Sequence, residues 1–156
     1  MINKEKILKI FTNALKSGNT PEKLTQSFCI GLFIAFSPFP GVHSVMMLFA
    51  KWWFGLNLPI LFFATSINNP WTIVPFYSFD YFFGLWFVHN LLGWNPTWII
   101  SLPKILGLGK VCLWSFLIGG NLLGLFFAVS CYPIMRFIFN KLANKNRDNY
   151  EDCRNE

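Results

Sequence analysis

Asp80 is the residue whose chemistry stands out first, because it is the only acidic residue between Glu22 and Asp148 and lies within a long apolar run. A carboxylate at membrane depth is costly and is a candidate functional group by default. The alternatives are an ion pair with Lys51 or His89, or a position near the membrane interface. We expect Asp80 to belong to a binding site, with those alternatives open.

A second candidate group surrounds the turn Ser37-Pro38-Phe39-Pro40-Gly41, which His43 and Ser44 follow closely. A helix that begins after this turn presents free N–H groups and the positive end of its dipole, which suit an anionic ligand. His43 could add a hydrogen bond or relay a proton; alternatively, a neighbouring carbonyl group satisfies its ring. The candidate substrate-binding residues here are Pro38, Pro40, Gly41, His43 and Ser44.

A third group lies around Pro70, where Asn68, Asn69 and Thr72 flank the proline. Asparagine before proline is a turn signal, and its side-chain amide can cap a broken helix end. The alternative is that the amides and freed carbonyl groups coordinate a ligand. The candidate substrate-binding residues of this turn are Asn68, Asn69, Pro70 and Thr72.

Both turns interrupt apolar stretches that are too short on either side to cross a membrane. The apolar part before Pro38 is roughly 9 residues, or about 14 Å of helix, against a hydrocarbon core of about 30 Å. Proline prevents a helix from running straight through. We therefore expect a re-entrant hairpin with Phe28 and Phe54 on the same side of the bilayer; the alternative is one long kinked helix. We also expect the turns 38–44 and 68–72 to meet inside the protein, because lipid cannot satisfy their backbone groups.

The remaining pattern predicts an all-α, multi-pass membrane protein with two broken segments. Residues 1–20 predict a basic amphipathic helix and a linker, the helix lying either in the membrane interface or against the domain. Residues 21–143 form the membrane domain and 144–156 a polar, disordered cytoplasmic tail. Helices are expected over 21–36, 42–54, 59–67, 71–92 and 111–135, the last spanning the membrane. Gly119, Gly120 and Gly124 should allow another helix to approach closely.

Composition excludes an ordinary soluble protein: 54% of the residues are hydrophobic and only 13% are charged, against about 25% charged in an average soluble domain. The charges gather at the two ends of the chain, with lysine and arginine in excess at both. The positive-inside rule then places both termini in the cytoplasm and makes the number of full crossings even. We expect contact with anionic lipid and no nucleic-acid binding.

Neither a cofactor nor an enzymatic activity is expected. The four cysteines lie in no metal-ligand spacing, and we expect neither a metal site nor a disulfide. Signatures of hydrolases, metalloproteases and phosphate-binding loops are also missing from the sequence.

The segment from Gly31 to Gly84 resembles the domain of unknown function 2062 family of bacterial integral membrane proteins. The resemblance rests on Gly31-x-Phe33, Pro38-x-Pro40-Gly41-x-His43-Ser44, Ala50, Asn57, Asn69-Pro70-x-Thr72, Pro75-x-Tyr77 and Gly84. It implies a multi-pass membrane domain without settled biochemistry. Asp80 and the bulky run Lys51-Trp52-Trp53 depart from the family pattern.

Two functions are compatible with these features. The first is a small transporter or flippase-like protein that handles an anionic or lipid-linked solute between the two breaks, working as a homo-oligomer because one chain has few helices to enclose a path. The second is an accessory protein that organises lipids or a partner membrane enzyme. His43, the asparagine pair and Asp80 matter for the first function and are dispensable for the second.

Overall fold

The computed structural model describes residues 13–14, 19–37, 41–68, 71–91, 93, 99–101 and 110–155. Its elements are α2 (Pro21–Ala35), α3 (His43–Phe54), α4 (Leu58–Thr65), α5 (Ile73–Asn90), β1 (Ile99–Ser101), β2 (Lys110–Cys112) and α6 (Leu113–Asn155). The two strands form a short antiparallel ribbon of three residue pairs. The fold is therefore helical, as the sequence predicted.

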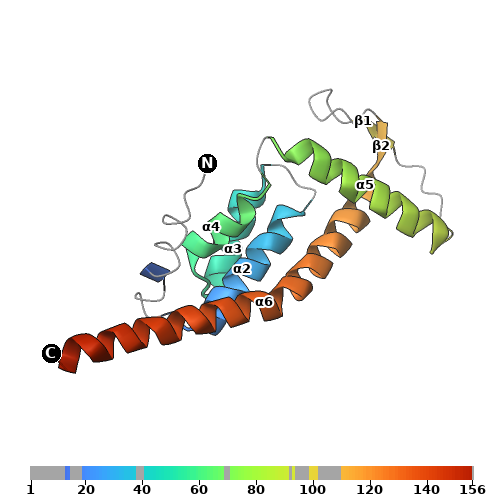
Figure 1. The fold of residues 1–156 in the computed structure, drawn as a ribbon. Helices are drawn as coiled ribbons and strands as arrows, with labels where there is room; N and C mark the ends of the chain where they lie inside the picture. The colour runs from blue at the N-terminus through green and yellow to red at the C-terminus, as the bar shows by residue number, and fades with distance from the viewer. Residues whose placement is uncertain are drawn as a thin grey trace.

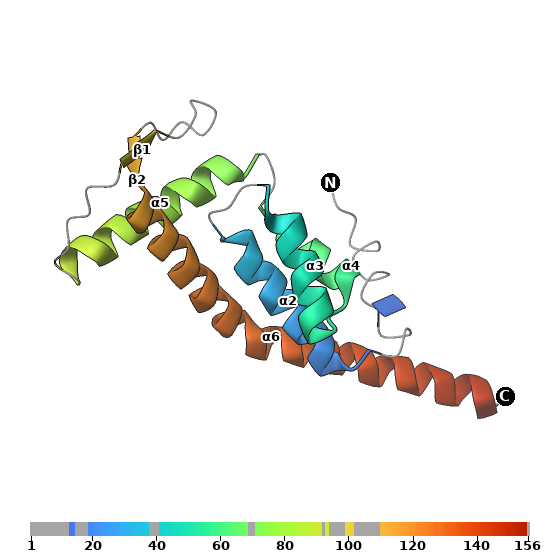
Figure 2. The same ribbon diagram turned by 180° about the vertical axis from the view of Figure 1, so that it is seen from behind.

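Helix α6 is the longest element, and the others are arranged along its first half (Figures 1 and 2). Its 43 residues correspond to about 65 Å of helix. Pro133 lies inside it, and a proline within a helix is a usual cause of bending. Among the described residues, one helix is long and apolar enough to cross a membrane, over Trp114–Asn144. Our expectation of a disordered tail from residue 144 is wrong, because α6 continues through Asn155.

Helix α2 lies between α6 and the pair α3 and α4, and it is buried on several sides (Figure 1). Gly31 makes its contact with α4 possible, because a Cβ atom there would come within 2.6 Å of the Leu61 carbonyl oxygen. Leu24 of α2, Ile60 of α4 and Phe139 of α6 meet in one fully buried cluster. The core of the protein is thus built around α2.

The ends of α2 are set by local sequence. Thr20 caps its start by accepting a hydrogen bond from the Lys23 N–H, and Pro21 occupies the first turn, as predicted. At the other end, the Ser37 N–H donates to the Ile34 carbonyl just before Pro38. The break after α2 is therefore where the prolines placed it.

Helices α2 and α3 form an antiparallel hairpin, and α4 returns beside α2 (Figure 2). Helix α3 ends at Gly55, whose φ of +61° is a left-handed conformation that favours glycine. Asn57 caps α4, and its own backbone N–H donates to the Ser27 hydroxyl at 2.8 Å. The end of α3 thus returns to the early part of α2, which rules out one helix continuing in a single direction.

Helix α5 crosses the first turns of α6 at the glycines of both helices (Figure 1). A Cβ atom on Gly119 would overlap the Asp80 carbonyl oxygen and lie 2.9 Å from the Gly84 nitrogen. Gly124 lies against α2, with Phe36 Cβ 3.1 Å from where its own Cβ would be. The predicted role of Gly119 and Gly124 in close helix packing is confirmed. The amphipathic helix and linker expected over residues 1–20 lie mostly outside the described residues, which include only 13, 14, 19 and 20 of that range.

Candidate functional site

Several buried polar atoms have no hydrogen-bond partner among the described residues, and they follow one another through the protein. They are His43 Nε2, Asn68 Oδ1, the Tyr77 hydroxyl, both carboxylate oxygens of Asp80 and Ser115 Oγ. We call these five residues the polar seam. Most buried polar groups in native proteins are paired, so each of these atoms requires an explanation. A ligand or an ordered water would supply the missing partners.

The seam begins at the C-terminal end of α2, where one residue from each predicted break, His43 and Asn68, lies against the α2 backbone. The Asn68 side-chain amide donates to the Ala35 carbonyl oxygen at 2.7 Å. The His43 ring faces the backbone of Ser37 and Ile34, although its Nε2 atom stays without a partner. Asn68 therefore caps a helix, as one interpretation of the sequence proposed. The cap belongs to α2, which lies 33 residues earlier in the chain.

Tyr77 and Asp80 continue the seam along α5, one helical turn apart. Both side chains are fully buried. The Tyr77 hydroxyl lies beside the Asn68 side chain and near the Asp80 carboxyl group, and its ring packs edge-on against Phe116 of α6 at 5.2 Å. Because neither carboxylate oxygen of Asp80 has a partner among the described residues, the ion pairs considered with Lys51 and His89 are not formed.

Ser115 ends the seam on α6. It is fully buried, and its carbonyl group contacts the site where a Cβ atom on Gly84 would stand. The close backbone approach of α5 and α6 therefore brings a hydroxyl and a carboxyl group to the same crossing without pairing either of them.

The other predicted site residues are placed differently. Ser44 is exposed and lines a separate cleft of about 410 Å³ between α3 and α4. Thr72 donates to the Ile67 carbonyl oxygen at 2.8 Å, within its own turn. Gly41 is exposed with a φ of +88°, as a tight turn requires. The remaining four, Pro38, Pro40, Asn69 and Pro70, lie outside the described residues.

Our sequence analysis missed two members of the seam as functional candidates. Tyr77 precedes Asp80 by three residues, a spacing that puts both on one face of a helix. Ser115 precedes Gly119 by four residues, so a polar residue and a small residue share the face that meets α5. Both signals are present in the sequence, but they gain meaning only when the packing partner is known.

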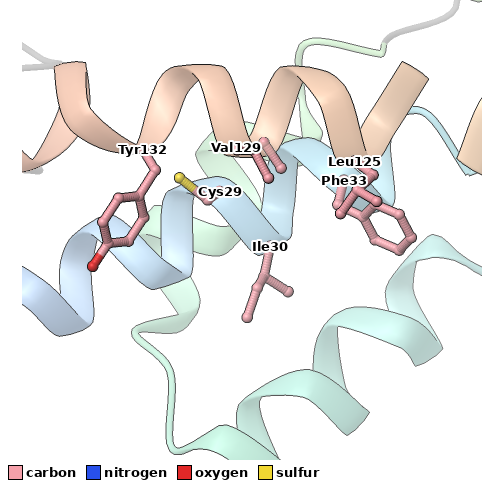
Figure 3. Close-up of a pocket in the computed structure, with 7 residues that line it drawn as sticks. Cys29, Ile30, Phe33, Leu125, Val129 and Tyr132 are labelled. Carbon is pink, nitrogen blue, oxygen red and sulfur yellow. The ribbon is translucent and has the colours of Figure 1, made fainter. Parts of the chain in front are cut away.

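An apolar cleft of about 380 Å³ lies between α2 and α6 (Figure 3). It is lined by Cys29, Ile30, Phe33, Leu125, Ala128, Val129 and Tyr132. Leu125 and Val129 are largely exposed, so the cleft opens on the outer face of α6. Phe33 is only two residues from Ala35, where Asn68 caps α2. The cleft and the start of the polar seam are thus both built on the last turns of α2, although residues two apart on a helix face different directions.

The described side chains show neither a metal cluster nor a disulfide. They contain no group of three or more histidine, cysteine, aspartate or glutamate residues that could hold a metal ion. Cys29 and Cys131 are free thiols. The chemistry that the seam can offer is hydrogen bonding through an imidazole, an amide and two hydroxyl groups, together with one carboxyl group.

Within the described part of the chain, one helix has the length and apolar composition that crossing a membrane requires, which by itself is a weak indication of membrane association. The chain belongs to the family described as uncharacterised proteins conserved in bacteria (DUF2062), whose model matches residues 5–148. The resemblance noted over 31–84 is thus confirmed and extends over most of the chain. No curated protein and no solved structure matches it.

Proposed function

We propose that this protein is a small multi-pass protein of the bacterial inner membrane that moves an anionic or lipid-linked solute across or within the bilayer. The polar seam carries the proposal, because its unpartnered atoms lie at the end of one broken helix and along the crossing of two others. Such groups are costly to bury unless a ligand or water satisfies them. The solute undergoes no chemical change, so the protein is not an enzyme.

The proposed membrane position follows from where the exposed apolar and basic side chains lie. Helix α6 spans the bilayer, and the α2–α3 hairpin enters and leaves on the cytoplasmic side. At the end of α3, Trp52 and Trp53 are 78% and 65% exposed and lie next to Lys51. Tryptophan and lysine together are typical of a membrane–water interface. The basic ends of the chain then lie in the cytoplasm, in contact with anionic lipid.

An anionic group is the chemistry that the start of the seam suits best. Helix α3 begins without a side-chain cap and without an acidic residue in its first turn, so its first N–H groups are left for another acceptor. His43 is the first residue of this helix, and its side chain is partly exposed. Tyr77 and Ser115 supply further hydroxyl donors deeper in the protein.

A lipid-linked solute would use both the polar seam and the apolar cleft, which α2 helps to build. The head of such a molecule would contact His43 and Asn68 at the end of α2. Its chain would lie in the cleft between α2 and α6, whose volume is about 380 Å³ and falls within the usual range of about 300–1,000 Å³ for ligand pockets. Because one chain has few helices to enclose a path, we propose that the protein works as a homo-oligomer.

Lipid profiling of a strain that lacks the protein tests this proposal. We expect an anionic, lipid-linked species to accumulate and the wild-type protein to restore its normal level. A variant with His43→Ala, Asn68→Ala and Tyr77→Phe should be present in the membrane without restoring it. Thr65→Val is the matched control, because Thr65 is buried but bonds the Phe62 carbonyl oxygen and Met47 Sδ. An unchanged profile in the deletion strain, or full restoration by the seam variant, would favour an accessory role.

A further inference from the structure

The carboxyl group of Asp80 is buried at the point where α5 and α6 approach most closely. Its side chain is fully buried and its two oxygens have no hydrogen-bond partner among the described residues. Its own backbone carbonyl group would overlap a Cβ atom on Gly119, so the two helix backbones are in direct contact there and leave no space for a side chain between them. A charged carboxylate in such a place lacks both water and a counterion.

The surroundings of Asp80 supply hydroxyl groups and no described positive charge. From its own helix, Tyr77 is the titratable neighbour. From α6, the residues at the crossing are Ser115, Phe116 and Gly119, none of which ionises in the physiological range. His43 faces the α2 backbone at the other end of the seam. The arrangement favours the neutral, protonated carboxyl group while the crossing stays closed.

We infer that Asp80 is a proton-binding site whose protonation holds the α5–α6 crossing closed and whose deprotonation opens it. The biological role of this site rests on the proposed function: if the protein is a transporter, the proton is its coupling ion. The site itself is defined by the buried carboxyl group, the Tyr77 and Ser115 hydroxyls and the glycine crossing.

The cycle follows from where each charge can be accommodated. In the closed form, the carboxyl group keeps its proton because an unpaired carboxylate would be buried without compensation. When α5 moves away from α6, water reaches Asp80 and accepts the proton. The carboxylate then accepts hydrogen bonds from water and from the Tyr77 and Ser115 hydroxyls. Closing again requires that a proton return to the same oxygen.

A proton fits this site better than a metal cation. A bound Na⁺ or K⁺ needs several oxygen ligands around a space of its own, whereas protonation needs no extra volume. Neither of the two clefts described above is lined by Asp80, Tyr77 or Ser115. Replacing Na⁺ by K⁺ at constant pH should therefore leave the crossing unchanged.

Distance measurement between spin labels on α5 and α6 tests the inference without any solute. Phe82 and Phe126 are 66% and 63% exposed, so each can carry a label in a cysteine-free chain reconstituted in lipid nanodiscs. We expect a longer mean distance at mildly alkaline than at mildly acidic pH. Asp80→Asn, which keeps the shape of the protonated acid but cannot ionise, should hold the short distance at both pH values. Asp80→Leu should do the same if the asparagine variant does not fold.

Two controls separate Asp80 from other titratable groups. His43→Ala and His89→Ala, which remove the two histidines of the chain, should each keep the pH-dependent change in distance, because the carboxyl group remains. The inference is overturned if Asp80→Asn responds to pH as the wild type does, if the wild type shows no change with pH, or if Na⁺ rather than pH moves the helices. Any of these results would leave the proposed transport function standing, since no solute enters the measurement.

Discussion

Replacing Asp80 by leucine should stabilise the protein while removing its function. The two side chains have the same number of heavy atoms and the same branching, but the two methyl groups of leucine are bulkier than the carboxylate oxygens. Two buried, unpartnered oxygens disappear, each costing about 1–3 kcal/mol, which gives a gain of about 4 kcal/mol. Overpacking by the methyl groups costs about 2 kcal/mol of this, so the expected net gain is about 2 kcal/mol. For a chain of this length that corresponds to a rise in Tm of about 4–8 °C.

Thermal unfolding in a mild detergent, followed by tryptophan fluorescence, measures this gain. Thr65→Val is the matched control, since it also removes a buried polar atom but one that is already hydrogen-bonded. Its Tm should stay unchanged or fall slightly, because a satisfied hydrogen bond is lost. A Tm for Asp80→Leu below that of the wild type would refute the reasoning, because it would mean that the carboxyl group has partners that stabilise the fold.

Three further predictions concern the packing and the topology. Gly119→Ala should destabilise the protein by about 2 kcal/mol, because overpacking costs up to about 3 kcal/mol and the higher helix propensity of alanine offsets about 1 kcal/mol of that cost. Gly124→Ala, whose contacts are looser, should change the stability by less than about 1 kcal/mol. Equal Tm values for the two variants would contradict the close crossing of α5 and α6. Asn68→Ala should lower the stability of the protein by about 1–3 kcal/mol, because it leaves the Ala35 carbonyl group without its hydrogen bond. Asn121→Ala should lower the stability less, because the Asn121 amide donates within its own helix. A similar loss of stability in both variants would argue against the cap. A periplasmic reporter fused to the C-terminus should be inactive, and an active one would overturn the proposed topology.

The helix boundaries were predictable because local signals set them. Thr20 with Pro21 began α2, and Gly55 with Asn57 separated α3 from α4, as capping and turn preferences indicate. The tail beyond residue 144 was not predictable in the same way. We took its polarity as a sign of disorder, but a helix that is already nucleated extends easily through polar residues.

The candidate site was predictable only in part, because it depends on how the helices are rotated. Asn68 and His43 were expected at the breaks, and both do contact the end of α2. Ser44 follows His43 directly, yet it lines another cleft because neighbouring residues on a helix face different directions. Tyr77 and Ser115 enter the seam through the α5–α6 crossing, which no local pattern fixes.

Native mass spectrometry of the protein purified from its own membrane tests the central claim most directly. We predict that the wild-type protein retains an anionic, lipid-linked molecule. We also predict that Thr65→Val retains it, and that a variant with His43→Ala and Tyr77→Phe loses it while remaining folded. Equal retention by that variant and the wild type, or an absence of any anionic lipid-linked molecule from the wild type, would contradict the claim that the polar seam is a solute-binding site.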